Sequence, residues 1–212
     1  DVYKRQMQQF LIIAAAHFLA LISPGPDFFL VARTSLAAGW RVASGACLGI
    51  AVANGVFIVA AFTGVSVLQP GSTPFIALQL VGCLYLLYLG VLFIRHAGSS
   101  VLQASGKAAP GGRASWLQAA GMGFLSGILN PKNALFYVSL ASMLGAQSSA
   151  GWKAFYGLWM FSVVLGWDLL VALAIGNGRL LRSFQRALPL LERLSGLVLI
   201  ALAAGMAGLL AS

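Results

Sequence analysis

Charged residues are scarce in this chain of 212 residues, and acidic residues are the scarcest. Asp, Glu, Lys and Arg together make up 8% of the sequence, and only four residues are Asp or Glu. Soluble domains carry about a quarter charged residues. A soluble fold of this length cannot bury the 60% of residues that are apolar. The composition therefore excludes an ordinary soluble domain and predicts an integral membrane protein.

Cysteine and histidine are equally rare, with two residues of each. Cys47 and Cys83 lie inside apolar segments, outside any C-x-x-C or Cys/His cluster. The sequence therefore predicts neither a disulfide framework nor a metal site. Both cysteines are expected to be small core residues.

The motifs of membrane-embedded enzymes and of ATP-driven pumps are missing too. The chain has no G-x-S-x-G for a serine nucleophile, no H-E-x-x-H zinc helix and no cluster of aspartates that would hold magnesium. It also has no Walker motif, which argues against ATP hydrolysis by this chain. We therefore expect a protein that is not an enzyme and that uses no cofactor.

The excess of positive charge has a different meaning. The net charge is +9, but the Lys and Arg residues lie mostly between apolar stretches or at their ends, without a basic face interleaved with aromatics. This placement argues against nucleic acid as a partner. It is typical of residues that orient a membrane protein.

Long apolar segments are what the sequence has instead. A transmembrane helix needs about 20 apolar residues. Residues 1–6 are polar, and we expect them to be a non-native remnant that precedes one transmembrane domain over 7–212. Six segments qualify as spans: about 7–32, 42–68, 74–94, 116–144, 152–175 and 189–210. In the alternative with five spans, one of these segments is re-entrant or lies at the membrane interface.

The loops between these segments differ in charge, which predicts the orientation. Nine Lys and Arg residues lie in or beside the first, third and fifth loops, and the other loops hold only Lys153. Under the positive-inside rule, the three basic loops face the cytoplasm and both termini lie outside. The nine residues are Arg33, Arg41, Arg95, Lys107, Arg113, Arg179, Arg182, Arg186 and Arg193.

The two halves of the chain share a pattern. A polar residue followed by proline interrupts the first and fourth segments, as Ser23-Pro24 and as Asn130-Pro131. Three spans per half give the halves opposite orientations, which is the architecture of many secondary transporters. We therefore predict an all-α membrane protein built as two inverted three-helix repeats, with broken first and fourth helices. The repeats are expected over about 7–95 and 114–212.

The first break, Ser23-Pro24-Gly25-Pro26-Asp27, is the strongest candidate for a binding site. Two prolines and a glycine inside an apolar segment remove backbone hydrogen bonds and break the helix. Ser23 is a good N-cap and Pro24 a good first helical residue, so a second half-helix is predicted to start there. Its free N–H groups and positive dipole end would suit a substrate carboxylate.

The second break, Asn130-Pro131-Lys132-Asn133, repeats the cap and the proline and adds a full positive charge. Non-helical backbone at this depth is tolerated only beside protein or a water-lined cavity. We therefore expect both breaks to bind substrate, together with the amide of Asn54 in the second segment. For Asn54, structural bonding between helices is an equally good explanation.

Two acids, Asp27 and Asp168, lie within apolar segments, where an unpaired charge is expensive. Each must pair, face water or take up a proton, and the last option suits coupling to a proton gradient. A static ion pair, for instance between Asp27 and Lys132, is the alternative. His17, about two turns before the first break, is better explained as a packing residue than as a proton relay.

These residues carry a resemblance to a known family. The stretch from Ser23 to Asp27 with the following FFLVARTSLAAGWRVASGACLGI, and the later GILNPKNALFYVSL, resemble the two signatures of the LysE/RhtB family of amino-acid exporters. The resemblance covers the chain from residue 7 onward. It implies efflux of amino acids such as threonine, homoserine or lysine across the bacterial cytoplasmic (inner) membrane, in exchange for protons. In this family, an acid is common at the position of Asp168.

Another class of function competes with the exporter. A channel, or a structural subunit of a membrane complex, would also tolerate two charged breaks. Dependence of efflux on a proton gradient would separate an exporter from a channel. The partners expected of an exporter are a small zwitterionic substrate, protons and the lipid bilayer. The sequence leaves open whether the protein forms a homo-oligomer.

Overall fold

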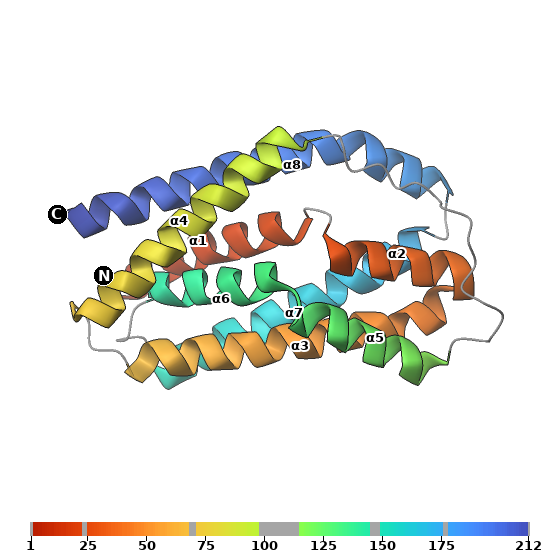
Figure 1. Cartoon of the computed structure of the whole chain (residues 1–212), viewed down its shortest axis with the longest axis horizontal. Coiled ribbons are helices and arrows are strands. Elements are labelled where there is room, and N and C mark those ends of the chain that lie inside the picture. Colours follow the sequence, from red (N-terminus) through yellow and green to blue (C-terminus); the bar gives the residue numbers. More distant parts are fainter. Residues whose placement is uncertain are drawn as a thin grey trace.

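The computed structural model describes residues 2–22, 25–67, 71–97, 115–144, 149–175 and 178–211. Within these residues the protein consists of helices (Figure 1). The predicted all-α class is confirmed, and the first and fourth predicted segments are each divided into two helices. The eight helices of the described part are α1 (Val2–Ile22), α2 (Pro26–Ala38), α3 (Trp40–Val67), α4 (Thr73–Arg95), α5 (Trp116–Ile128), α6 (Pro131–Leu144), α7 (Ala150–Ile175) and α8 (Gly178–Ala211).

Four of these helices are long and apolar enough to cross a membrane: Trp40–Gly64 of α3, Thr73–Arg95 of α4, Ala150–Ile175 of α7 and Arg186–Gly208 of α8. Helix α1 from Met7, together with α2, would form a fifth span, bent by 53° at the break. Helices α5 and α6 have 13 and 14 residues, and each alone is too short to cross about 30 Å of hydrocarbon. The described structure thus supports four to five spans, and six remain a prediction.

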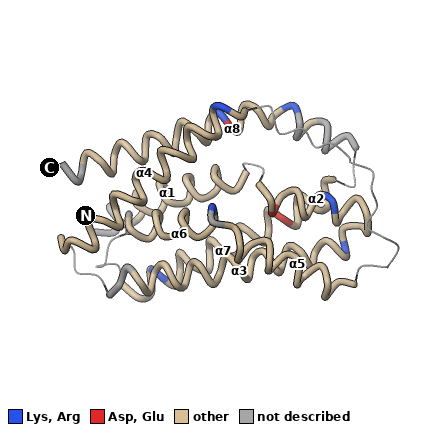
Figure 2. The backbone as a smooth tube through the Cα atoms, in the orientation of Figure 1, with Lys and Arg blue, Asp and Glu red and all other residues tan. Residues whose placement is uncertain are grey.

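The helices run back and forth between the two ends of an elongated bundle, and both termini lie at the same end (Figure 1). Helices α1 and α6 occupy the half that contains the termini, whereas α2 and α5 occupy the other half. The two helix breaks therefore fall near the middle of the bundle. Figure 2 shows Lys and Arg on α2 and α3 toward the end opposite the termini, on α8 from the middle of the bundle outward, and also in the half that contains the termini.

Two clusters of buried apolar side chains hold this arrangement together. The larger cluster joins α1, α3, α4, α6, α7 and α8 and includes Leu86, Leu140 and Met160. The smaller joins α2, α3 and α7 and includes Val31 and Cys47. Because α3 and α7 contribute to both clusters, they form the continuous frame on which the halves of the broken helices pack.

Both cysteines are buried and free, as the sequence predicted for small core residues. Cys47 packs in the smaller cluster. The thiol of Cys83 lies 3.1 Å from the carbonyl oxygen of Ala203, so it contributes to the contact between α4 and α8.

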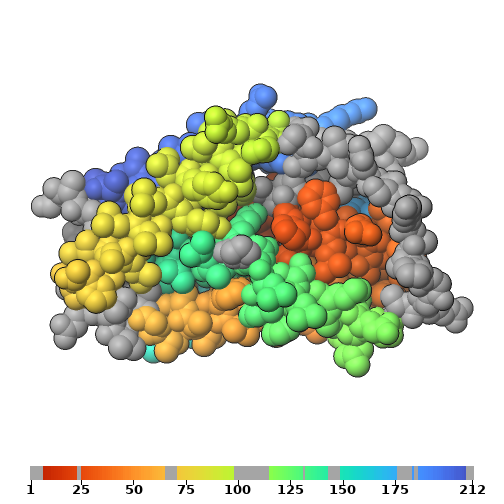
Figure 3. Space-filling model, in the orientation of Figure 1, coloured from red at the N-terminus to blue at the C-terminus, as the bar shows by residue number. Residues whose placement is uncertain are grey.

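Large apolar side chains also cover the outside of the bundle. Leu117, Leu129 and Leu158 are 74%, 76% and 69% exposed. Figure 3 shows one face of the molecule, on which α3, α4, α5 and α6 lie side by side. Such a surface would be costly in water, whereas the hydrocarbon of a bilayer accommodates it.

Glycines bring α3 and α5 into direct backbone contact. Residues 45–49 and 123–127 each form a G-x-x-x-G motif, which lets membrane helices approach closely. A Cβ atom added at Gly49 or at Gly123 would collide with the facing helix, and the atom struck from Gly123 is the carbonyl oxygen of Ala46. Because lipid supplies no hydrophobic drive between helices, this van der Waals contact stabilises the pair.

Replacement of Gly123 by alanine should therefore destabilise the protein. The added methyl group would push α5 away from α3, and overpacking of this kind costs about 1–3 kcal/mol. The measurement is thermal unfolding of the purified protein in detergent. Gly121→Ala, on the same helix, is the matched control because nothing lies within 4 Å of its added Cβ, and the better helix propensity of alanine should leave its melting temperature equal or higher. Equal losses of stability in the two variants would contradict the packing described here.

Candidate functional site

The first helix break lies between Ile22, where α1 ends, and Pro26, where α2 begins. The sequence placed the start of the second half-helix at a Ser23 cap followed by Pro24. That prediction is wrong by two residues, because the structure has Gly25 as N-cap, with extended backbone at φ −131° and ψ −172°. A residue before a proline avoids the helical conformation, so Gly25 stays outside the helix. Pro26 is the first residue of α2. Ser23 and Pro24 themselves lie outside the described residues.

The second break follows the predicted cap and proline. Helix α5 ends at Ile128, and α6 begins at Pro131. The backbone N–H of Lys132 donates to the side-chain oxygen of Asn130 at 3.1 Å, so Asn130 acts as the N-cap. The side chain of Pro131 lies outside the described part, but its place as the first helical residue is confirmed.

A helix that ends inside a membrane leaves carbonyl oxygens without partners. Side chains of other helices supply donors to the end of α1. The hydroxyl of Ser195 on α8 donates to the carbonyl oxygen of Leu19 at 2.8 Å. The ammonium group of Lys132 on α6 lies 3.5 Å from the carbonyl oxygen of Ala20, which is a long hydrogen bond. Two carbonyl oxygens in the last turn of α1 thus have side-chain partners from other helices.

The carboxylate of Asp27 joins the two breaks. It lies in the first turn of α2, where the helix dipole favours a negative charge. Three neutral donors from the other break reach it: the hydroxyl of Ser126 at 2.6 Å, the amide of Asn133 at 2.8 Å and the amide of Asn130 at 3.2 Å. Among the described residues no ion pair joins Asp27 to Lys132, and the direct contacts of the carboxylate are these hydrogen bonds.

A cavity lies where the two breaks meet. Its volume is about 50 Å³. A buried water molecule needs about 10–15 Å³ of such space, so the cavity has room for about four. Both apolar clusters contribute to its walls. The lining residues are His17, Ala20, Leu21, Gly25, Asp27, Phe28, Ile50, Asn54, Asn130, Lys132, Asn133, Phe136, Tyr137, Val164, Trp167 and Asp168.

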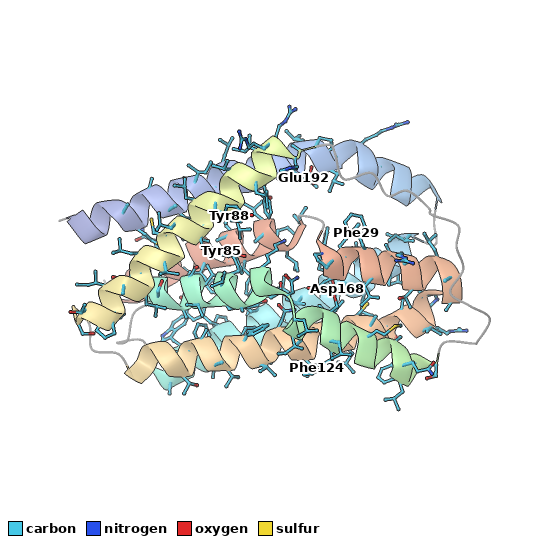
Figure 4. The ribbon with its side chains drawn as sticks, in the orientation of Figure 1. Phe29, Tyr85, Tyr88, Phe124, Asp168 and Glu192 are labelled. Atoms are coloured by element: carbon cyan, nitrogen blue, oxygen red, sulfur yellow. The ribbon has the colours of Figure 1, made fainter. Side chains whose placement is uncertain are left out.

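Asp168 of α7 faces this cavity from the continuous frame. Figure 4 shows it midway along the bundle. The residue is 5% exposed, and within the described part of the chain its Oδ2 atom is buried without a hydrogen-bond partner. A bare acceptor of this kind costs free energy unless water, a proton or a ligand compensates it.

Lys132 and His17 are the basic side chains in the wall of the cavity. The Lys132 ammonium lies 5.1 Å from the centre of the Phe93 ring, a cation–π contact that compensates part of its charge. His17 shares a 3.1 Å hydrogen bond between its Nε2 and the hydroxyl of Tyr137, whereas its Nδ1 is buried without a partner among the described residues.

Most residues singled out from the sequence come together at this cavity. Those that line it are Gly25, Asp27, Asn54, Asn130, Lys132, Asn133 and Asp168. Pro26 is exposed and is not among the lining residues. The side-chain amide of Asn54 donates to the carbonyl of Ile50 in its own helix at 2.8 Å.

Several other residues of the cavity wall are not among the binding residues predicted from the sequence, and His17 and Trp167 are two of them. Only their position signalled a role: His17 is about two turns from the first break, and Trp167 precedes Asp168.

The cavity can hold a small molecule that carries both charges. Lys132 offers a positive group, Asp168 and Asp27 offer negative ones, and the side-chain amides of the second break offer donors and acceptors. The remaining walls are apolar, which suits a small aliphatic side chain. Among the described residues no cluster of three metal-ligating side chains occurs.

Comparison with known proteins gives the chain relatives of one kind. A family model described as LysE type translocator matches residues 17–208. The chain is 30% identical over 194 residues to the threonine efflux protein of Escherichia coli (strain K12), covering 88% of this chain and 91% of that protein. It is 27% identical over 208 residues to the leucine efflux protein of Klebsiella pneumoniae, covering 93% of each. No solved structure matches the chain.

The bonding of the two acids predicts unequal effects on stability. Asp27→Asn should lower the melting temperature, because an amide accepts fewer hydrogen bonds and its NH₂ group would replace the acceptor either of Ser126 or of the two asparagine amides. Loss of such bonds costs about 2 kcal/mol or more. Asp168→Asn is the matched control, since it breaks no hydrogen bond of the described structure and removes an uncompensated charge. Thermal unfolding of both purified variants tests this, and a larger loss for Asp168→Asn would contradict the role of Asp27.

Proposed function

Because the chain belongs to the LysE type translocator family, we propose that it exports a small amino acid from the cytoplasm across the bacterial inner membrane, in exchange for protons. It is a transporter and not an enzyme. The family relatives named as threonine and leucine efflux proteins support amino acids as substrates. Threonine and leucine are the first substrates to test, and homoserine and lysine follow from the sequence resemblance.

The observation that carries the proposal is the cavity between two helix breaks, lined by charges of both signs. An amino acid at neutral pH is a zwitterion. Its carboxylate would bind near Lys132 and the start of a half-helix, and its ammonium group would bind near Asp27 or Asp168. A buried ammonium and a buried carboxylate are expensive when each is alone, and the substrate would compensate both.

Proton exchange follows from the same charges. A carboxylate that has released the substrate's ammonium group into the external medium can take up a proton there and return without a bare charge. Release of that proton to the cytoplasm would restore the site for the next substrate. The proton thus replaces the ammonium group on the return step, which is antiport between two states of one site. Asp27 and Asp168 are the two candidate carriers.

We further propose six spans in two inverted repeats. In this arrangement α1 with α2 forms the first span and α5 with α6 the fourth. The cap and proline at Asn130-Pro131, and the cap and proline at Gly25-Pro26, support the pairing of these two spans. Both termini lie at one end of the bundle (Figure 1), as an even number of spans requires.

Export can be measured in bacterial cells that lack their own threonine and leucine exporters. Cells that express the protein should expel labelled threonine or leucine against a concentration gradient, and a protonophore should stop this efflux. Replacement of the proton-carrying acid by asparagine should abolish uphill efflux while the protein stays inserted. If Asp27→Asn and Asp168→Asn both drive uphill efflux at the wild-type rate, proton coupling through these acids is wrong. Efflux that runs only downhill and ignores the protonophore would indicate a channel.

The orientation can be tested with single cysteines and a membrane-impermeant maleimide. Arg41, next to the start of α3, and Ala150, at the start of α7, are exposed. The starts of these two helices lie at opposite ends of the bundle (Figure 1), and the native cysteines are buried. Ala150→Cys should react in intact spheroplasts, because its loop is predicted to lie outside. Arg41→Cys should react only after the membrane is opened. The reverse pattern would contradict the orientation, and reaction of both from one side would contradict six spans.

A further inference from the structure

We infer that the two acids of the cavity have different roles: Asp168 binds the ammonium group of the substrate, and Asp27 is a positioning residue that holds the two helix breaks together. This inference rests on the proposed amino-acid export. It assigns a specific contact to one of two carboxylates that the sequence treats alike.

The hydrogen bonds of Asp27 already occupy it. Its Oδ1 accepts from Ser126, and its Oδ2 accepts from both Asn130 and Asn133. A carboxylate offers about four lone-pair sites, and three are taken by groups of the opposite break. An ammonium group could reach only the remaining site on Oδ1, beside Ser126, unless the amides that join α2 to α5 and α6 were released. Its place in the wall therefore shapes the cavity.

Asp168 presents the opposite situation. It is almost fully buried, it lines the same cavity, and in the described part of the chain its Oδ2 atom lacks a partner. An ammonium group brings three donors, and a charge-assisted bond to this oxygen would remove the cost of the bare acceptor. The bare Nδ1 of His17 lies in the wall of the same cavity. Two buried polar atoms without partners at one cavity indicate a ligand that supplies them.

The positive end of the site is Lys132. Its ammonium group has one long hydrogen bond, 3.5 Å to Ala20, and so retains donors for a substrate carboxylate. With Asp27 occupied, Asp168 is the one acid of the described cavity wall left for an ammonium group. The site therefore fits amino acids with a single amino group, and the side-chain ammonium of lysine would find no partner.

Binding of truncated ligands to the purified protein in nanodiscs tests this assignment. The probes are L-threonine, 3-hydroxybutyrate, which lacks the amino group, and 1-amino-2-propanol, which lacks the carboxylate. For a leucine-binding protein the matching set is L-leucine, 4-methylpentanoate and 3-methylbutylamine. The wild type should prefer the amino acid over the ligand without an amino group by about ten- to a hundred-fold.

The variants separate the two acids. Asp168→Asn should lose the preference for the ligand with an amino group and keep the preference for the ligand with a carboxylate. Asp27→Asn and Asn133→Ala should weaken all ligands together and keep both preferences, because they loosen the walls without removing the contact. Asp168→Ser serves if Asp168→Asn does not fold. L-lysine should bind no more tightly than L-norleucine, which lacks only its side-chain ammonium.

Three outcomes would overturn the inference. One is an unchanged amino-group preference in the Asp168 variants. Another is loss of that preference in Asp27→Asn while Asp168→Asn retains it. The third is tighter binding of lysine than of norleucine, which would require a second free acid. If the wild type binds no amino acid at all, the proposed function itself is wrong, and the inference falls with it.

Discussion

Inside a bilayer no water is available to bind the backbone groups of an interrupted helix, and this constraint shapes the middle of the protein. The chain interrupts two helices there and places the breaks against each other. Asp27 accepts hydrogen bonds from Ser126, Asn130 and Asn133 across the gap. Ser195 donates to the end of α1. The tie through Asp27 lets two broken helices act as parts of one bundle.

Some polar groups of the cavity take no part in these hydrogen bonds. Asp168 and His17 each have one buried atom without a partner among the described residues, and the ammonium group of Lys132 retains free donors. These groups stand at the boundary between the two apolar clusters, since α1 and α6 pack in the larger and α2 in the smaller. In the proposed proton-driven export, such a site would open toward either end if one cluster shifted against the other on the frame of α3 and α7.

The close contact between α3 and α5 depends on glycines and not on these polar groups. Helix α5 touches α3 through glycines at 45–49 and 123–127, where the backbones themselves meet. A contact of this kind depends on the lack of a side chain, and it keeps one half of a broken helix fixed while the other half packs elsewhere. The described structure thus combines a rigid contact, α3 with α5, and a polar contact, Asp27 with the α5–α6 break. Both support the cavity without touching Asp168.

The sequence by itself determined the class of the fold and the places where helices break. Apolar runs longer than a bilayer is thick require a membrane, and prolines such as Pro131 interrupt a helix wherever they stand, because both effects are local. The prediction from local sequence was wrong at the first break, because α2 begins at Pro26 and not at Pro24. The partners of Asp27 lie 99 to 106 residues away in the chain, and attraction between opposite charges pointed to Lys132. Only the tertiary structure decided that neutral groups of the other break surround Asp27, and that Asp168 lines the cavity while its Oδ2 has no partner among the described residues. Hydrogen bonds between distant segments depend on how the helices pack.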